Sequence, residues 1–130
     1  MSIAIACLII AGLLIYLTKV PVGYAMVKLD GRYDNRTPRA QQSRLQGFGA
    51  RAMGAHQNAI EAFPLFAAGV LVALWAQAPQ ATVNYLCIAF IVFRIVYTFL
   101  YWFDFNKTRS TVWFMGLICS FWLMALALYV

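Results

Sequence analysis

Four long apolar stretches constrain this chain more than any other feature of its sequence. A bilayer core of ~30 Å is crossed by a helix of about 20 apolar residues. The chain has 130 residues, of which 64% are hydrophobic and 11% charged, so it has room for four such helices and short loops. We therefore predict an all-α integral membrane protein, a single-domain four-helix bundle. The expected helices cover residues 3–28, 44–77, 83–105 and 111–130.

Basic residues gather in the first and third predicted loops, whereas residues 77–84 between the middle helices carry no charge. The positive-inside rule then predicts that loops 1 and 3 face the cytoplasm and that both termini lie on the opposite side. This topology accounts for the net charge of +6, and we expect no nucleic-acid partner because the loops lack base-stacking context. The basic residues in and beside these two loops are Lys28, Arg32, Arg36, Arg39, Arg44, Lys107 and Arg109.

The cysteines and the histidine indicate packing rather than chemistry. Cys7, Cys87 and Cys119 lie in separate apolar runs without the paired spacing of a metal site, so we expect them to be buried. His56 is the only histidine and has no metal-ligating partner at helical spacing. We expect a structural role for it, no metal site, and no hydrolytic nucleophile. The first apolar run lacks the flanks of a signal peptide, so we interpret it as the first span.

Polar side chains inside the apolar stretches are the candidate functional residues, because a charge at bilayer depth is costly. Glu61 lies ten residues from Arg51, and Arg94 lies ten residues from Asp104. Both are therefore ~15 Å below the cytoplasmic side, so we predict an ion pair between them. Lys19 lies at a similar depth, and the resulting excess of positive charge favours an anionic ligand. Each middle helix has one polar face, formed by Arg51, Gly54, Asn58 and Glu61 and by Arg94, Tyr97, Tyr101 and Asp104.

A purely structural interpretation of the same residues stays open. Polar side chains hold membrane helices together, and this role would suffice for Asn58, Glu61 and Arg94. Arginines near the interface can extend toward water, and buried tyrosines can pack with their hydroxyl groups paired. That alternative covers Arg51, Arg109, Tyr97 and Tyr101.

Three segments resemble the MAPEG family, the membrane-associated proteins in eicosanoid and glutathione metabolism. RAMGAHQNAIEAFPLF, residues 51–66, is similar to its second-helix signature, and FRIVYTFLY, residues 93–101, resembles its third-helix motif. Arg109 and Ser110 resemble the site where prostaglandin E synthase-like members place an arginine beside the glutathione sulfur. The resemblance covers all four predicted helices and is that of a bacterial-type member. The signature positions are Arg51, Ala55, Asn58, Glu61 and Pro64.

The resemblance implies a left-handed bundle that assembles as a homotrimer in the bacterial inner membrane. It further implies that glutathione binds as co-substrate between subunits near the cytoplasmic face, and that lipophilic small molecules react there in a transferase or peroxidase reaction. Gly54 departs from the well-studied eukaryotic members, which tend to have a second arginine there. The implied glutathione-binding residues are Arg51, Asn58, Glu61, Arg94, Tyr97 and Tyr101, and the implied catalytic residue is Arg109.

Two other functions fit a chain of this kind. One is a non-enzymatic membrane scaffold that binds a lipid or thiol, since a shared fold does not guarantee catalysis. The other is a small four-helix multidrug transporter with a membrane-embedded glutamate. A transporter needs a glutamate that is free to exchange protons, and Arg94 at the same depth argues against this for Glu61.

Overall fold

The computed structural model describes residues 2–129, and within that range it is entirely helical. Four of the helices are long and apolar enough to cross a membrane, which confirms the predicted fold class. A fifth, short helix lies in the first connection. In chain order the helices are α1 (Ser2–Asp30), α2 (Pro38–Gln42), α3 (Gly47–Trp75), α4 (Gln80–Trp102) and α5 (Asn106–Leu126).

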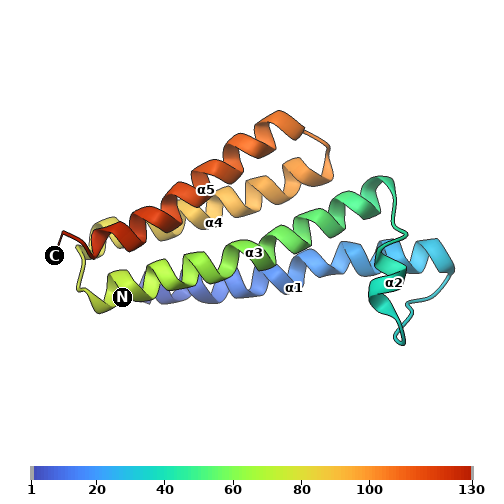
Figure 1. Cartoon of the computed structure of the whole chain (residues 1–130), viewed down its shortest axis with the longest axis horizontal. Helices are drawn as coiled ribbons and strands as arrows, with labels where there is room; N and C mark the ends of the chain where they lie inside the picture. The colour runs from blue at the N-terminus through green and yellow to red at the C-terminus, as the bar shows by residue number, and fades with distance from the viewer. Residues whose placement is uncertain (1, 130) are drawn as a thin grey trace.

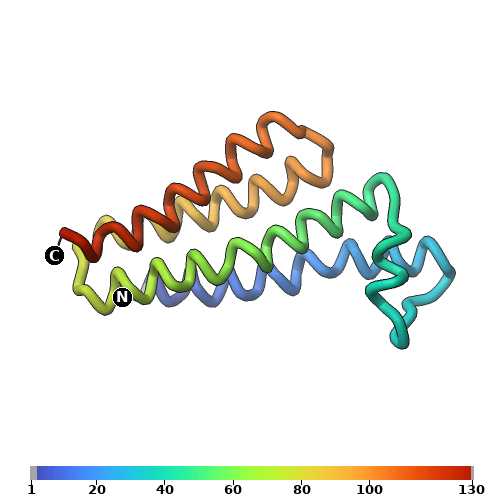
Figure 2. The backbone as a smooth tube through the Cα atoms, in the orientation of Figure 1, coloured from blue at the N-terminus to red at the C-terminus, as the bar shows by residue number. Residues whose placement is uncertain are grey.

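The long helices form two antiparallel pairs, α1 with α3 and α4 with α5 (Figure 1). Both ends of the chain lie at one end of the bundle, and the pairs diverge toward the other end (Figure 2). The α1–α3 and α4–α5 connections share that other end. The basic residues of the two connections are therefore gathered at one end of the molecule, as the topology prediction requires.

The ends of α3 and α4 differ from the predicted residues 77 and 105. Each helix stops two residues before a residue in the left-handed conformation, Gln77 with φ 56° and Asp104 with φ 66°. The amide of the next residue bonds to the carbonyl five residues back, at 3.0 and 2.9 Å respectively, as in a Schellman motif. Asp104 therefore lies beyond α4 and not on its polar face as predicted. Glycine usually marks such an end, so these two were not visible in the sequence.

The first connection is more ordered than the predicted polar loop. Its anchor is Gln41, which is 1% exposed. The Gln41 Nε2 atom lies 3.1 Å from the Met26 carbonyl and 2.9 Å from both the Arg32 carbonyl and an Asp30 carboxylate oxygen. These contacts satisfy the Met26 carbonyl in the last turn of α1, which ends at Asp30 rather than at residue 28, and tie the connection to that helix end. Arg44 also forms an ion pair with Asp30.

The boundaries of the remaining helices also shift. Helix α3 begins at Gly47 rather than at residue 44, because α2 and its following turn occupy residues 38–46. Helix α5 begins at Asn106 rather than at residue 111, directly after the turn that ends α4, and ends at Leu126. Arg109 consequently lies in the first turn of α5, a rigid element, and not in a loop.

Many small side chains line the interior beside a few large ones such as Phe66 and Met26, and most of the outer surface is large and apolar. Alanines of α1 and α3 are buried, whereas side chains such as Val20, Leu71 and Trp122 are exposed on the outer surface. Membrane bundles have this arrangement because small residues let helices approach while lipid covers the larger ones. The three cysteines are buried and free, which confirms the prediction made for them.

Candidate functional site

The polar faces predicted for the two middle helices meet along the α3–α4 contact. Near the end of the bundle where the helix pairs diverge, Arg51 Nε donates a hydrogen bond of 3.1 Å to the carbonyl of Trp102 at the end of α4. At the deeper end, Asn58 Oδ1 accepts a hydrogen bond of 2.8 Å from Arg94 Nη2. The Asn58–Arg94 bond joins the two predicted polar faces, whereas Arg51 contacts a backbone carbonyl outside the predicted face of α4. Arg51 thereby satisfies an unpaired carbonyl of α4, which is a structural role.

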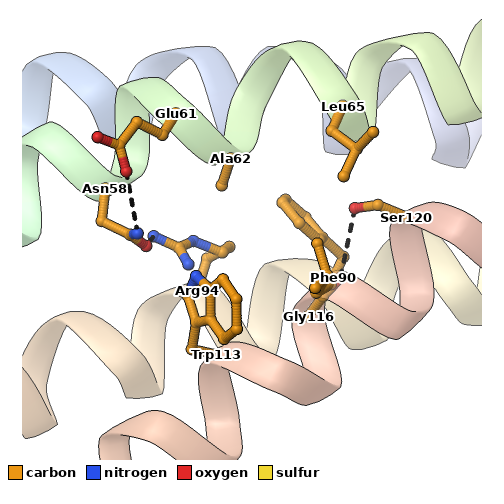
Figure 3. A pocket seen from close by; sticks show the side chains of 10 residues that line it. Asn58, Glu61, Ala62, Leu65, Phe90, Arg94, Trp113, Gly116 and Ser120 are labelled. Atoms are coloured by element: carbon orange, nitrogen blue, oxygen red, sulfur yellow. Dashed lines mark hydrogen bonds between the residues drawn. The ribbon is translucent and has the colours of Figure 1, made fainter.

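The predicted ion pair between Glu61 and Arg94 is wrong, because Asn58 lies between the two charges. The Asn58 amide accepts from Arg94 through its oxygen and donates to Glu61 Oε2 over 3.4 Å through its nitrogen (Figure 3). Asn58 is one helical turn before Glu61 on α3, so its side chain reaches α4 first. Arg94 is 6% exposed, whereas the Glu61 side chain is exposed. The opposite charges are linked without neutralising one another directly.

A row of stacked side chains connects Arg94 to Arg109. The Arg94 guanidinium carbon lies 4.5 Å from the centre of the Tyr97 ring. Tyr97 and Tyr101 pack edge to face, with ring centres 5.7 Å apart and planes at 80°. The Arg109 guanidinium carbon lies 3.9 Å from the centre of the Tyr101 ring. Both arginines are within the range of a cation–π interaction, so the row places Arg109 in line with the buried charges.

A pocket of about 130 Å³ opens between α3, α4 and α5 beside Arg94. Its polar end is formed by Asn58, Glu61 and Arg94, and its apolar end includes Phe90 (Figure 3). Trp113 also lines the pocket next to Arg94. The sequence does not mark Trp113 as a site residue, because a tryptophan in a membrane helix is ordinarily an interfacial or packing residue. The pocket joins charged and apolar surfaces, as a site for an amphipathic ligand requires.

A second, larger pocket of about 490 Å³ lies on the side of α3 that faces α1 and α2. Lys19 and Arg39 line this pocket, and Glu61 borders both pockets. Lys19 therefore belongs to a different side of the bundle from Arg94, although Glu61 borders the pockets of both residues. The residue spacing along the first helix predicts the level of Lys19 but not the direction of its side chain.

His56 borders the second pocket, but its ring is hydrogen-bonded to α1, the helix that pairs with α3. Its Nδ1 atom lies 3.0 Å from the carbonyl of Ile15 and 3.2 Å from the Thr18 hydroxyl. Only a protonated Nδ1 can donate to the carbonyl, so this bond selects the tautomer. The structural role predicted for His56 is confirmed.

The comparisons with known proteins give the same classification as the sequence motifs. The MAPEG family model matches residues 3–129, nearly the whole chain. Comparison with curated proteins and with solved structures finds no significant match. A family match of this extent, together with four apolar helices of membrane-spanning length, fixes the classification. This chain is a member of the MAPEG family.

Proposed function

We propose that this protein is a glutathione-dependent membrane transferase or peroxidase that acts on lipophilic electrophiles. In this proposal Arg94, Asn58 and Glu61 bind the tripeptide together with Tyr97 and Tyr101, and Arg109 assists the thiol. The reaction takes place near the cytoplasmic face of the inner membrane, with loops 1 and 3 cytoplasmic. MAPEG membership, which is broadly associated with glutathione, gives the proposal its family context.

The Arg94–Asn58–Glu61 arrangement is the observation that carries the proposal. Glutathione has two carboxylates and one ammonium group at neutral pH. Arg94 offers a guanidinium whose forked donors suit a carboxylate, and Glu61 offers a carboxylate that suits an ammonium. Because Asn58 separates these side chains, each retains binding capacity for a ligand group of opposite charge.

Pocket size and exposure favour a site that a neighbouring subunit completes. Ligand pockets usually measure about 300–1,000 Å³, and the pocket beside Arg94 is smaller, at about 130 Å³. The exposed Glu61 carboxylate would face lipid in an isolated chain, which is costly at bilayer depth. A second copy of the chain would cover Glu61 and enlarge the pocket. We therefore retain the homotrimer as part of the proposal.

The chemistry assigned to Arg109 is stabilisation of the thiolate, the nucleophilic form of glutathione. The sulfur would form a bond to the electrophilic carbon, and the leaving group would depart with the electron pair. In the peroxidase reaction the sulfur would instead attack a peroxide oxygen, and the O–O bond would break to release an alcohol or water. A second glutathione would then displace the hydroxyl of the resulting sulfenic acid, giving glutathione disulfide and water. The lipophilic substrate would approach through the apolar end of the pocket, where Leu65 and Phe90 lie.

The proposal is tested by calorimetric titration of glutathione into detergent-purified protein. Arg94→Ala and Glu61→Gln should each abolish measurable binding, because each removes the partner of one ligand charge. Arg36→Ala, an exposed arginine of the first connection, is the control and should bind like the wild type. Unchanged binding in both site variants would exclude the site. Binding by the wild type without conjugation or peroxide reduction across a panel of electrophiles would instead identify a non-enzymatic scaffold.

One argument against the transporter alternative is removed by the structure, and the family match supplies a different one. Arg94 does not pair directly with Glu61, so direct neutralisation no longer counts against proton exchange. Family membership now separates the chain from such transporters.

A further inference from the structure

Gly54 interrupts the polar face of α3 at a place where the neighbouring helix comes very close. Glycine is a poor residue for a helix interior, so its presence calls for a local reason. A Cβ atom built on Gly54 would lie 2.6 Å from the Cζ atom of Tyr101, and nearer still to the tyrosine hydroxyl oxygen. No ordinary side chain fits there unless Tyr101 moves. The missing side chain is therefore what lets the tip of Tyr101 reach the backbone of α3.

The same ring also contacts the arginine to which we assign the thiol chemistry. Arg109 packs over the face of Tyr101 at 3.9 Å, and Tyr97 packs against the ring at 5.7 Å. Within residues 2–129 the Arg109 side chain makes neither a hydrogen bond nor an ion pair. The Tyr101 ring is thus the principal contact that orients its guanidinium in this part of the chain.

We propose that Gly54 is a positioning residue for Arg109. By admitting the tip of Tyr101 against α3, it fixes the ring, and the ring fixes the guanidinium relative to the Arg94 pocket. This inference rests on the proposed function in one respect, that Arg109 acts on the glutathione thiol. The packing relation among the three residues does not depend on what the ligand is.

The direct test replaces Gly54 by alanine and measures turnover, glutathione binding and the ultraviolet absorbance of bound thiolate. Gly54→Ala should lower turnover on the order of 10- to 100-fold, because small displacements of a catalytic group have effects of this size. The thiolate signal should fall in parallel. Glutathione affinity should fall less than turnover, because Tyr101 moves whereas Arg94 and Asn58 stay in place. Gly23→Ala is the matched control, since a Cβ there meets nothing within 4 Å. It should leave all three measurements unchanged.

Two double variants separate positioning from general damage to the fold. The effects of Gly54→Ala and Arg109→Ala on turnover should not multiply in the double variant, because Gly54 acts through Arg109. In a Tyr101→Ala background, Gly54→Ala should lower neither turnover nor the thermal midpoint any further, because the ring it would displace is gone and alanine is the better helix former. Multiplicative effects, or an undiminished effect of Gly54→Ala without the Tyr101 ring, would overturn the proposal.

Failure of the proposed function gives a different result from failure of this inference. If the wild type neither binds glutathione nor turns over electrophiles, the proposed function is wrong. The thermal midpoint then still tests the packing relation. Gly54→Ala should lower the midpoint in the presence of Tyr101 and should not lower it in the Tyr101→Ala background. A fall in both backgrounds, or no fall in the presence of Tyr101, would refute the inference.

Discussion

Arg94 on α4 donates a hydrogen bond of 2.8 Å to the side-chain oxygen of Asn58 on α3. This bond joins the two helix pairs at a point where the guanidinium is almost completely buried. It also orients the Asn58 amide group, whose nitrogen then faces Glu61. One asparagine thus both pairs a buried cation and holds a carboxylate apart from it.

Asn58→Ala should destabilise the protein and weaken ligand binding together. It leaves the buried Arg94 guanidinium without its partner, and an unsatisfied buried polar group costs about 1–3 kcal/mol. Thermal unfolding in detergent and glutathione titration measure the two effects. Asn84→Ala is the matched control, because Asn84 accepts a bond of 2.9 Å from Gln80 one turn away on the same helix and joins no other element. Equal loss of stability in both variants would show that Asn58 is not special.

Arg109→Ala should separate catalysis from binding. Removal of a group that stabilises developing charge lowers turnover on the order of 10²-fold or more, whereas glutathione affinity should remain near the wild-type value. Arg109→Lys should recover only part of the activity, since lysine keeps the charge but not the planar stacking on Tyr101. Steady-state kinetics and titration check both variants, with Lys107→Ala as the control. A loss of affinity as large as the loss of turnover would contradict the division of roles.

Gly69→Ala should loosen the contact between α3 and α5. A Cβ on Gly69 would lie 2.7 Å from the backbone carbonyl oxygen of Ser120, which cannot move without shifting its helix. Overpacking of this kind costs about 1–3 kcal/mol, and the thermal midpoint should fall. Gly12→Ala is the control, because its Cβ would meet Phe63 at an ordinary 3.8 Å. If both variants melt alike, the close approach does not contribute to stability.

The connection between α1 and α3 should become less ordered at acidic pH. Asp34 accepts hydrogen bonds from the Thr37 hydroxyl and from the amides of Thr37 and Arg36, and these bonds lower the pKa of its carboxyl group. A lowered pKa means that the stabilisation is complete above the ordinary aspartate value of about 4. It is lost as the pH falls through the folded-state pKa. Limited proteolysis between residues 31 and 43 should therefore accelerate in that range. In Asp34→Asn it should be faster at neutral pH and depend less on pH, because only the Asp30 carboxylate, which contacts Gln41 and Arg44, remains to be protonated.

Periodicity predicted which faces of the middle helices meet, but not which atoms pair. The 3.6-residue repeat is enough to bring Asn58 and Arg94 to the same contact, because both lie on the polar faces of their helices. It does not reveal that the shorter Asn58 side chain intervenes before Glu61. The direct ion pair was predicted from depth alone, and depth leaves the order of side chains within a contact undetermined.

The stacked row illustrates a second limit of prediction. The spacing of Tyr97 and Tyr101 showed that they share a face, yet the position of Arg109 depended on where α5 begins. That start follows from the left-handed Asp104, a conformation that non-glycine residues adopt for reasons of local packing. The turn therefore brings Arg109 onto the Tyr101 ring, and the sequence of residues 103–110 contains no pattern that predicts this turn.

By itself the sequence determined that the chain forms four apolar membrane helices, that a polar layer runs along the middle two, and that the cysteines are buried. These properties follow from composition and helical period, which act locally along the chain. Only the tertiary structure decided that Asn58 links Arg94 to Glu61, that Gly54 admits Tyr101, and that Lys19 faces another pocket. Those outcomes depend on the separation and rotation of packed helices, because shifts of a few ångströms there change which side chains touch.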